Sequence, residues 1–291
     1  MKEKIFMIIS MLIFGSIGLI VKGIPLSSSQ IAMTRGLIGS LFLIIASIIM
    51  KKKPSYKEIK RNLKILIASG AALGFNWILL FEAYKNTSIT NATLSYYFAP
   101  VIVVFLSPLI LKDKLTLRKA LSILVAIIGM FLVAWTGGDG SIAGNELLGI
   151  GFGLSAAFLY ALVVIFNKLI KNMGGFDITI IQLSIASMIL LPYVLLQGPI
   201  PLNLLNASEI IRLLLVGLLN TGLAYLLYFS SVQKLESQTV AVFSYIDPIS
   251  ALVMSAIFVG EKISGLQLMG GILILGSAFV SGMNHRPNRR C

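Results

Sequence analysis

The chain contains two similar stretches of sequence. The first reads Tyr97-Phe98-Ala99-Pro100, then an apolar run, then Leu111-Lys112-Asp113-Lys114-Leu115-Thr116. The second reads Tyr245-Ile246-Asp247-Pro248, then an apolar run, then Val259-Gly260-Glu261-Lys262-Ile263-Ser264. Matched positions are 148 residues apart, as Tyr97 is from Tyr245. The same spacing pairs Gly74 with Gly222, Trp77 with Tyr225 and Phe81 with Phe229. Self-similarity at a fixed spacing indicates a repeat, so the chain consists of two homologous halves.

The composition is that of a protein embedded in a membrane. Of the 291 residues, 57% are hydrophobic and 12% are charged, with a mean hydropathy of +0.94. Soluble domains are about half apolar and about a quarter charged, so this chain has too few charges to cover a soluble core. Its one cysteine, Cys291, and one histidine, His285, exclude a disulfide framework and a Cys/His metal cluster. We therefore expect a polytopic membrane protein without a cofactor.

Runs of about 20 mostly apolar residues, the length of a bilayer-spanning helix, account for most of the chain. Ten such runs occur, at 4–22, 29–50, 63–84, 89–111, 118–136, 147–167, 177–197, 209–231, 238–259 and 265–283. They are continuous rather than alternating, which favours helices over the strands of a membrane barrel. The first run is too long for the apolar part of a signal peptide and has no clean cleavage site, so it is interpreted as the first span. The sequence predicts an all-α integral membrane protein with ten transmembrane helices.

The ten runs divide evenly between the two halves. The first repeat is expected at 4–136 and the second at 147–283, each with five helices. Residues 137–146 are expected to form an outer connecting loop, and residues 284–291 a basic cytoplasmic tail. No gap between runs is long enough for a folded soluble domain.

Basic residues are unevenly distributed between the two sides that ten spans create. With the N-terminus inside, nineteen of the 24 Lys and Arg residues face the cytoplasm, and Lys22, Lys85 and Lys262 face the other side. This asymmetry follows the positive-inside rule. The net charge of +13 is therefore explained by topology and not by nucleic-acid binding. We expect a multi-pass protein of the cell (inner) membrane with both termini cytoplasmic.

Five spans per repeat is an odd number, so the second half must enter the membrane upside down relative to the first. The fold class predicted is thus two inverted five-helix repeats. Inverted repeats related by an axis in the membrane plane are a recurring architecture of secondary transporters, because each half can adopt the packing of the other in an alternating-access cycle. The alternative is that duplication only enlarged a helix bundle.

With ten spans, two repeats and a Tyr-x-x-Pro motif in the fourth helix of each, followed by Lys112-Asp113-Lys114-Leu115-Thr116 or Gly260-Glu261-Lys262-Ile263-Ser264, the chain resembles the drug/metabolite transporter superfamily. It is most similar to the EamA-type group, whose members export amino acids and related small metabolites. The resemblance covers roughly 4–135 and 147–283. It implies alternating-access transport through a central cavity lined mainly by spans 1, 3, 4, 6, 8 and 9. It does not specify the cargo.

Asp247 is the charged residue nearest the middle of a span. A charge there costs about 2.5–3.5 kcal/mol on insertion scales, so it needs a reason. Its counterpart in the first repeat is Ala99, which means that the fold itself requires no carboxylate at this position. Pro248 cannot donate a backbone hydrogen bond and frees the carbonyl of Ser244. We expect Asp247 to bind an ammonium group or a proton; the alternative is a polar group at a helix kink, satisfied by a neighbouring hydroxyl.

Arg35 and Glu82 both lie toward the outer ends of their spans. One interpretation is an ion pair between neighbouring helices, since paired charges are the usual way to tolerate burial in a membrane. The other is functional: the two residues form an outer gate, or Arg35 receives the carboxylate of a substrate. The sequence leaves both open.

Aromatic and amide side chains occupy the positions expected to face the cavity. The candidates for substrate binding are Asn76, Trp77, Tyr97, Tyr160, Asn220, Tyr225 and Tyr245, with helix packing as the alternative for each. Pro100 and Pro248 are equivalent in the two repeats, should bend both helices near mid-membrane, and are hinge candidates. Small residues such as Gly74, Gly270 and Gly276 predict close helix contacts.

No motif of a soluble enzyme is present. The sequence has no P-loop, and Gly149-x-Gly151-x-Gly153 lies inside an apolar run rather than after a strand. It has too few ligands for a metal site and no embedded histidine for a catalytic triad. We expect a secondary transporter and not an enzyme, most simply an exporter of amino acids or related small metabolites. Its expected partners are a small-molecule substrate, the lipid bilayer and protons as the coupling-ion candidate, with the chain a monomer or homodimer.

Two alternatives remain at this point. Efflux of cationic drugs or toxicants would use Asp247 and Glu82 as counter-charges. An intramembrane lipid-modifying enzyme is disfavoured, because no pair of catalytic polar groups shares a depth at the cytoplasmic interface.

Overall fold

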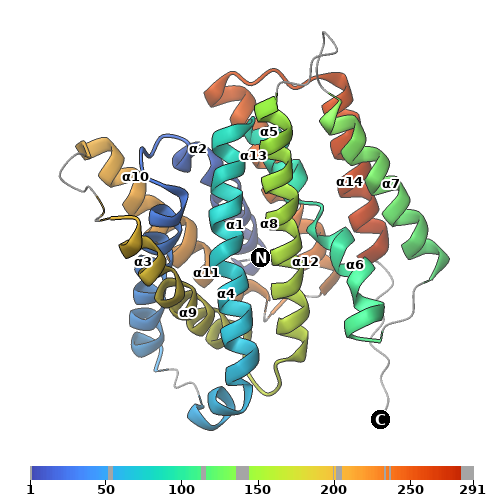
Figure 1. Cartoon of the computed structure of the whole chain (residues 1–291). Coiled ribbons are helices and arrows are strands. Elements are labelled where there is room, and N and C mark those ends of the chain that lie inside the picture. Colours follow the sequence, from blue (N-terminus) through green and yellow to red (C-terminus); the bar gives the residue numbers. More distant parts are fainter. Residues whose placement is uncertain are drawn as a thin grey trace.

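The computed structural model describes residues 2–51, 55–112, 116–135, 144–198, 200, 205–232, 234–235 and 237–282. All secondary structure in these ranges is helical, and the long helices stand side by side (Figure 1). Within them, nine segments of at least 18 residues are apolar enough to cross a bilayer, and Gly265–Val280 supplies a shorter tenth. The prediction of a ten-helix integral membrane protein is confirmed.

The first repeat comprises α1 (Lys2–Gly15) with α2 (Ile17–Val21), α3 (Ser28–Ile49), α4 (Tyr56–Asn86), α5 (Ile89–Tyr96) with α6 (Ala99–Ile110), and α7 (Leu117–Ala134). The second comprises α8 (Gly144–Leu169), α9 (Gly175–Leu196), α10 (Ala207–Gly217) with the π-helix η2 (Leu218–Leu223) and α11 (Ala224–Val232), α12 (Ser237–Ser244) with α13 (Ile246–Met254) and the π-helix η3 (Ser255–Val259), and α14 (Gly265–Gly282). Asp113, most of the predicted connecting loop and the tail 284–291 lie outside the described residues.

Polar residues in the loops set the starts of several helices. Ser27 and Gln30 form a reciprocal capping box at the start of α3, and Asn206 and Glu209 form another at the start of α10. Ser88 accepts a hydrogen bond from the third residue of α5. Such caps satisfy N–H groups that have no partner inside the helix. They explain why these helices begin where the apolar runs begin.

The main contacts between spans are symmetric: each has an equivalent when the two repeats are exchanged. The first span contacts the eighth and ninth, through α1 with α11 and α13, and the sixth span contacts the third and fourth, through α8 with α4, α5 and α6. The second and seventh spans pair as α3 and α9. Glu261, which follows the ninth span, hydrogen-bonds to the start of the fourth at Ile89, so these equivalent spans run in opposite directions. This is the arrangement of inverted repeats.

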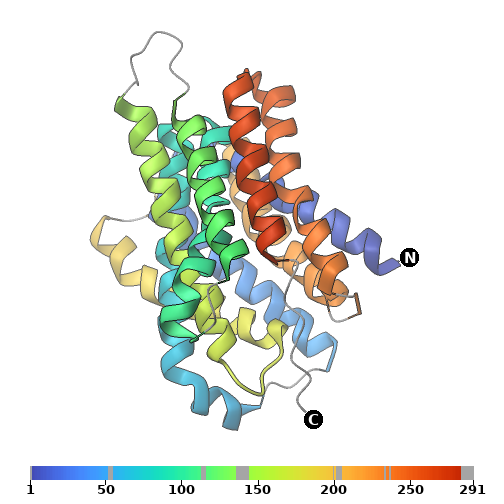
Figure 2. The same ribbon diagram turned by 90° about the vertical axis from the view of Figure 1, so that its right-hand side faces the viewer.

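The fifth and tenth spans, α7 and α14, lie together at one edge of the bundle in Figure 1 and stand side by side facing the viewer in Figure 2. A Cβ atom on Gly270 would lie 2.5 Å from the carbonyl oxygen of Gly129, and one on Gly129 would lie 2.8 Å from that of Gly270. The predicted close contact at Gly270 is confirmed. The prediction for Gly276 is wrong, because a Cβ there would meet nothing within 4 Å.

The two spans that carry Pro100 and Pro248 are interrupted near these prolines. Pro100 and Pro248 lack the N–H that would bond to the carbonyls of Tyr96 and Ser244, and α5 and α12 end at those two residues. The next helices, α6 and α13, begin at Ala99 and Ile246. The two breaks are equivalent under the repeat and lie deep within their spans.

Candidate functional site

A cavity of about 500 Å³ lies between the two repeats, where the fourth and ninth spans are interrupted. Its walls include residues of spans 1, 3, 4, 6, 8 and 9, the set that the family resemblance implies. Spans 2 and 7 contribute as well, through Arg35 on α3 and through Thr179 and Gln182 on α9. The volume is within the range of pockets that hold small organic ligands.

Asp247 lines the cavity and is bonded across the repeat boundary. The hydroxyl of Tyr97 donates a hydrogen bond to its Oδ2. The neighbouring hydroxyls serve the backbone instead, since Ser244 Oγ donates to the Val240 carbonyl and Ser250 Oγ to the carbonyl of Asp247. Asp247 also lies in the first turn of α13, where the helix dipole favours a negative charge. The Tyr97 hydroxyl and the first turn of α13 therefore hold the carboxyl group at the cavity wall.

Arg35 is buried in the wall of the same cavity, with 4% of its surface exposed. Its Nε donates a hydrogen bond of 2.7 Å to Thr221 Oγ1 on η2. The centre of its guanidinium group lies 4.4 Å from the ring centroid of Trp77 and 5.7 Å from that of Phe81. Stacking on a ring and a hydrogen bond at Nε fix the plane of the group.

The ion pair between Arg35 and Glu82 that one interpretation predicts is not formed. The Glu82 carboxylate lies 4.0 Å from Lys85 Nζ, one turn further along α4, and its side chain is 34% exposed. Lys85 Nζ also donates to the carbonyl of Leu26. Glu82 does not line the cavity. The physical reason is the direction of the side chain: Glu82 reaches the loop end of the bundle, whereas Arg35 points into it.

Aromatic rings form much of the remaining wall. Trp77, Tyr97, Tyr160 and Tyr225 line the cavity as expected, and Pro100 lies at its edge. The ring of Tyr96 lies 5.5 Å from that of Tyr160, and Phe14 packs edge-on to Tyr225 at 5.1 Å. Phe14 and Tyr84 also line the cavity, although the sequence did not single them out. Tyr84 is two helical turns from Trp77 on α4, so helical spacing alone could have found it.

Three predicted binding residues do not line the cavity. Asn76 and Asn220 are fully buried and brace the repeats: Asn76 Nδ2 donates to the Ala156 carbonyl at 2.6 Å, and Asn220 Nδ2 donates to the Ile13 carbonyl. An amide in an apolar environment needs such a partner. Tyr245 packs on the ring of Phe279, 5.7 Å away. Pro248 is also outside the lining. Tyr245 and Pro248 lie at the helix break behind Asp247.

The two ends of the cavity differ in exposure. Lining residues toward the ends of α8 and α11, such as Asn167 and Phe229, are partly exposed, whereas those at the other end, such as Tyr84 and Leu80, are buried. Near the exposed end, Gln182 Nε2 donates to both Asn167 Oδ1 and Ser69 Oγ at 2.5 Å. The cavity therefore opens at the end where α8 and α11 finish.

Glu261 is not part of the cavity lining and makes its contacts among the spans at the buried end. Its Oε1 accepts from the Ile89 N–H at 2.8 Å, and its Oε2 accepts from the N–H and hydroxyl of Thr90 at 3.1 and 3.0 Å. Lys22 Nζ lies 3.6 Å from Oε1. Gly260, with φ of 73°, turns the chain so that the next side chain can reach α5. One carboxylate thus joins the ends of spans 1, 4 and 9.

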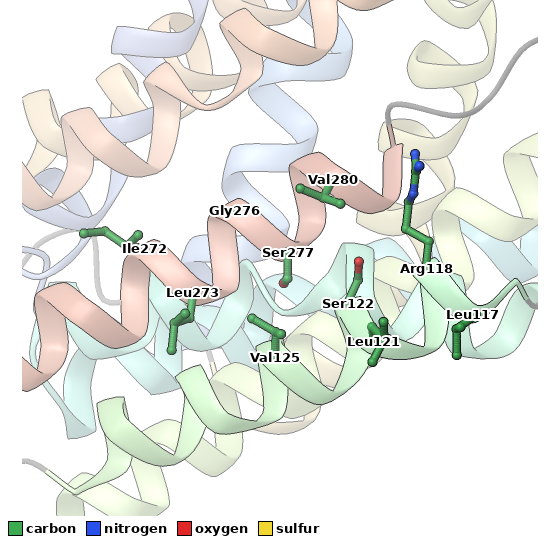
Figure 3. Close-up of a pocket in the computed structure, with 10 residues that line it drawn as sticks. All are labelled: Leu117, Arg118, Leu121, Ser122, Val125, Ile272, Leu273, Gly276, Ser277 and Val280. Atoms are coloured by element: carbon green, nitrogen blue, oxygen red, sulfur yellow. The ribbon is translucent and has the colours of Figure 1, made fainter.

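A second hollow lies on the outside of the bundle, between α7 and α14 (Figure 3). The repeat spacing of 148 residues makes Ser277 the counterpart of Gly129 and Ser122 the counterpart of Gly270. The side chains of Ser122 and Ser277 face each other across this groove (Figure 3). The groove is otherwise apolar, with Arg118 at one end, and is separate from the central cavity.

Comparison with known proteins links this architecture to transport. The profile of the EamA-like transporter family matches residues 1–135 and 147–283. A relative in Bacillus subtilis, named "Uncharacterized transporter YxxF", is 31% identical over 92% of this chain and 85% of its own length. Protein RarD of Salmonella typhimurium is 25% identical over 79% and 76%. A solved crystal structure with 16% identity superposes with a TM-score of 0.64 over 96% of both chains, which supports the fold.

Proposed function

The chain belongs to the EamA-like transporter family, and we propose that it is a secondary transporter that exports amino acids or related small metabolites by alternating access. The observation that carries this proposal is the hydrogen bond from Tyr97 to Asp247, which joins the two repeats at the central cavity. Both partners lie at the interruption of a proline-bearing span. A change in the relative position of the repeats must therefore alter the surroundings of the one carboxyl group that lines this cavity among the described residues.

Asp247 is the candidate for coupling or for substrate binding. A carboxyl group in a mid-membrane cavity can carry a proton or attract an ammonium group, and either role links its state to transport. The aromatic wall supplies surface for a partly apolar solute. Efflux of organic cations is the competing function within transport. It is supported by Asp247 and the aromatic rings, which also suit a cation, but Glu82 is not in the cavity to assist.

The orientation is proposed from the positive-inside asymmetry. With both termini in the cytoplasm, the ends of α8 and α11 lie on the cytoplasmic side, so the partly exposed end of the cavity faces inward. The contacts of Glu261 then close the outward end. An inward-facing state is the one in which an exporter loads its cargo.

The experiment that tests this proposal is counterflow in proteoliposomes. Vesicles of purified protein are preloaded with the twenty standard amino acids, and uptake of the same ¹⁴C-labelled amino acids at tracer concentration is followed against protein-free vesicles. We expect transient accumulation of at least one amino acid. Counterflow of tetraphenylphosphonium without any amino acid would assign the protein to cation efflux. Counterflow of neither solute class, in protein that is monodisperse and folded, would overturn the proposal. The vesicles contain no candidate lipid substrate, so solute movement cannot come from a lipid-modifying activity.

A further inference from the structure

The central cavity contains two opposite charges. Among its described lining residues, Arg35 is the one cation and Asp247 the one anion. They do not neutralise each other, since no ion pair within 4.0 Å joins them. Asp247 is bonded to Tyr97, and Arg35 to Thr221. Two charges that are kept apart inside a membrane protein, one of them the buried Arg35, are costly, and the cost needs a function.

The guanidinium group of Arg35 has unused hydrogen-bonding capacity. Its Nε is bonded to Thr221, and one face lies on Trp77. In the described part of the chain, neither terminal nitrogen donates to an acceptor, and no carboxylate lies within ion-pair distance. A planar guanidinium held at Nε and at one face still presents the N–H fork that binds a carboxylate through two hydrogen bonds.

Structural roles for Arg35 are less economical. Support of η2 through Thr221 requires only a neutral donor, and contact with Trp77 requires only an apolar group. Neither role explains why a permanent charge is retained at 4% exposure. The approximate counterpart of Arg35 in the second repeat is Gln182, since α3 and α9 both begin and end 147 residues apart. Gln182 also lines the cavity and is 3% exposed, but it carries no charge. The fold therefore requires no charge at the place of Arg35, as it requires none at Ala99, the counterpart of Asp247.

We propose that the cavity selects a zwitterion, with the substrate carboxylate on Arg35 and the substrate ammonium on Asp247. This proposal rests on the proposed transport function and narrows its substrate class. A zwitterion of matching length neutralises both buried charges at once, and its side chain lies against the rings of Tyr96, Tyr160 and Tyr225. An organic cation would leave Arg35 without a counter-charge, and an organic anion would leave Asp247 without one.

The test compares three solutes that share one skeleton. For each amino acid that shows counterflow, the corresponding decarboxylated amine and deaminated acid are used as competitors; for L-leucine these are 3-methylbutan-1-amine and 4-methylpentanoate. In the wild type we expect both analogues to compete at least about tenfold more weakly than the amino acid, the effect of one lost charge-assisted hydrogen bond. Equal competition by the amine would overturn the zwitterion site, while counterflow itself would still support transport.

Variants assign the carboxylate to Arg35. Arg35→Gln should lower amino-acid counterflow about tenfold or more and leave inhibition by the amine unchanged. The ratio of the amine's competition to that of the amino acid should therefore approach one in this variant. Arg212→Gln, which removes an arginine outside the cavity lining, is the matched control and should keep the wild-type ratio. Equal weakening of amino-acid and amine competition in folded Arg35→Gln would show a structural role only.

If Arg35→Gln does not fold, Thr221→Val is the second variant, because it releases Nε of Arg35 without removing the charge. It should weaken amino-acid competition more than amine competition, and an unchanged ratio there would contradict the proposal.

Discussion

Tyr97 of the first repeat donates a hydrogen bond to Asp247 of the second repeat. The reciprocal pair, Tyr245 and Ala99, cannot form this bond because position 99 carries a methyl group. The two repeats therefore share one helix arrangement, but the side chains at their central helix breaks differ. In the proposed alternating-access cycle the two repeats exchange between related packings. Asp247 is the one carboxyl group in the described cavity lining, and it has no carboxyl counterpart in the other repeat.

Replacement of Asp247 by Asn keeps the shape and removes the ionisable group. If the carboxyl group couples protons, Asp247→Asn should retain counterflow and lose accumulation driven by a pH gradient. If it binds the substrate ammonium, binding should weaken by about 1.5–3 kcal/mol and counterflow should fall with it. Tyr97→Phe, which keeps the carboxyl group, is the matched control and should lose less in either assay. Wild-type behaviour of Asp247→Asn in binding, counterflow and gradient-driven uptake would remove this residue from the mechanism.

Pro100→Ala and Pro248→Ala should restore the backbone hydrogen bonds to Tyr96 and Ser244 and make the fourth and ninth spans more continuous. We expect transport rates to fall more than binding affinity, because a stiffer helix slows the change of state. The expectation is sharpest for Pro248→Ala, since Pro248 lies outside the cavity lining whereas Pro100 is part of it. Single-turnover exchange and equilibrium binding measure the two effects separately. Pro108→Ala, further along α6, is a control for proline removal as such. Unchanged rates in both hinge variants would leave the prolines with a packing role.

Loss of Glu261 should destabilise the closed end of the cavity. Glu261→Ala removes the acceptor of two backbone N–H groups and one hydroxyl at the start of α5, a capping loss of about 0.5–2 kcal/mol. Lys22→Gln removes only an ion pair whose lysine side chain is 38% exposed, worth about 0–1 kcal/mol. Thermal unfolding in one detergent should rank the two variants in that order. A larger loss for Lys22→Gln would mean that the ion pair, and not the cap, maintains this end.

The glycines of α14 provide a matched pair for close packing. Gly270→Ala places a Cβ against the backbone of Gly129, which cannot yield as a side chain can, and should cost about 1–3 kcal/mol. Gly276→Ala points into open space at the groove and should change stability by no more than about 0.5 kcal/mol. Unfolding temperatures of the two purified variants test this difference. Equal unfolding temperatures of the two variants would show that contact with α7 does not limit the side chain at position 270, and a response to helix propensity alone would stabilise both variants.

The topology is tested through Cys291, the one thiol in the chain, which lies outside the described residues. Ten spans and the basic tail predict a cytoplasmic location for it. An impermeant maleimide should therefore label it in inverted vesicles and leave it unlabelled in intact cells. Cys291→Ser is the control for non-specific labelling. Labelling in intact cells would show that the orientation is reversed or that the number of spans is odd.

The fold could be predicted because its signals are local and strong. Span length follows from apolar runs, and inversion follows from an odd number of spans in each repeat. Asp247 stood out because a charge interrupts an apolar run where the other repeat has Ala99. These signals concern depth in the membrane, and depth is what hydropathy reports.

The rest of the site depends on the direction of side chains around each helix, which hydropathy does not report. Arg35 and Glu82 lie at similar depth, yet one points into the cavity and the other toward Lys85. Asn76 and Asn220 have the polarity of binding residues but satisfy carbonyls of the opposite repeat. Tyr84 lies two helical turns from Trp77 and could have been found from that spacing, whereas Phe14 offers no such relation to a predicted residue on its own helix.

The contacts of Glu261 also constrain how the protein is made. The start of α5 is synthesised 172 residues before the carboxylate that caps it, so the fourth span must enter the membrane with that end incomplete. Ser88 caps the third N–H of α5 locally, but the first two acquire their carboxylate acceptor only after the ninth span has been inserted. The first half, although it is a full five-helix repeat, therefore matures late and depends on the second. Separately expressed halves should need each other during biogenesis, with assembly limited by how long the unpaired half survives membrane quality control.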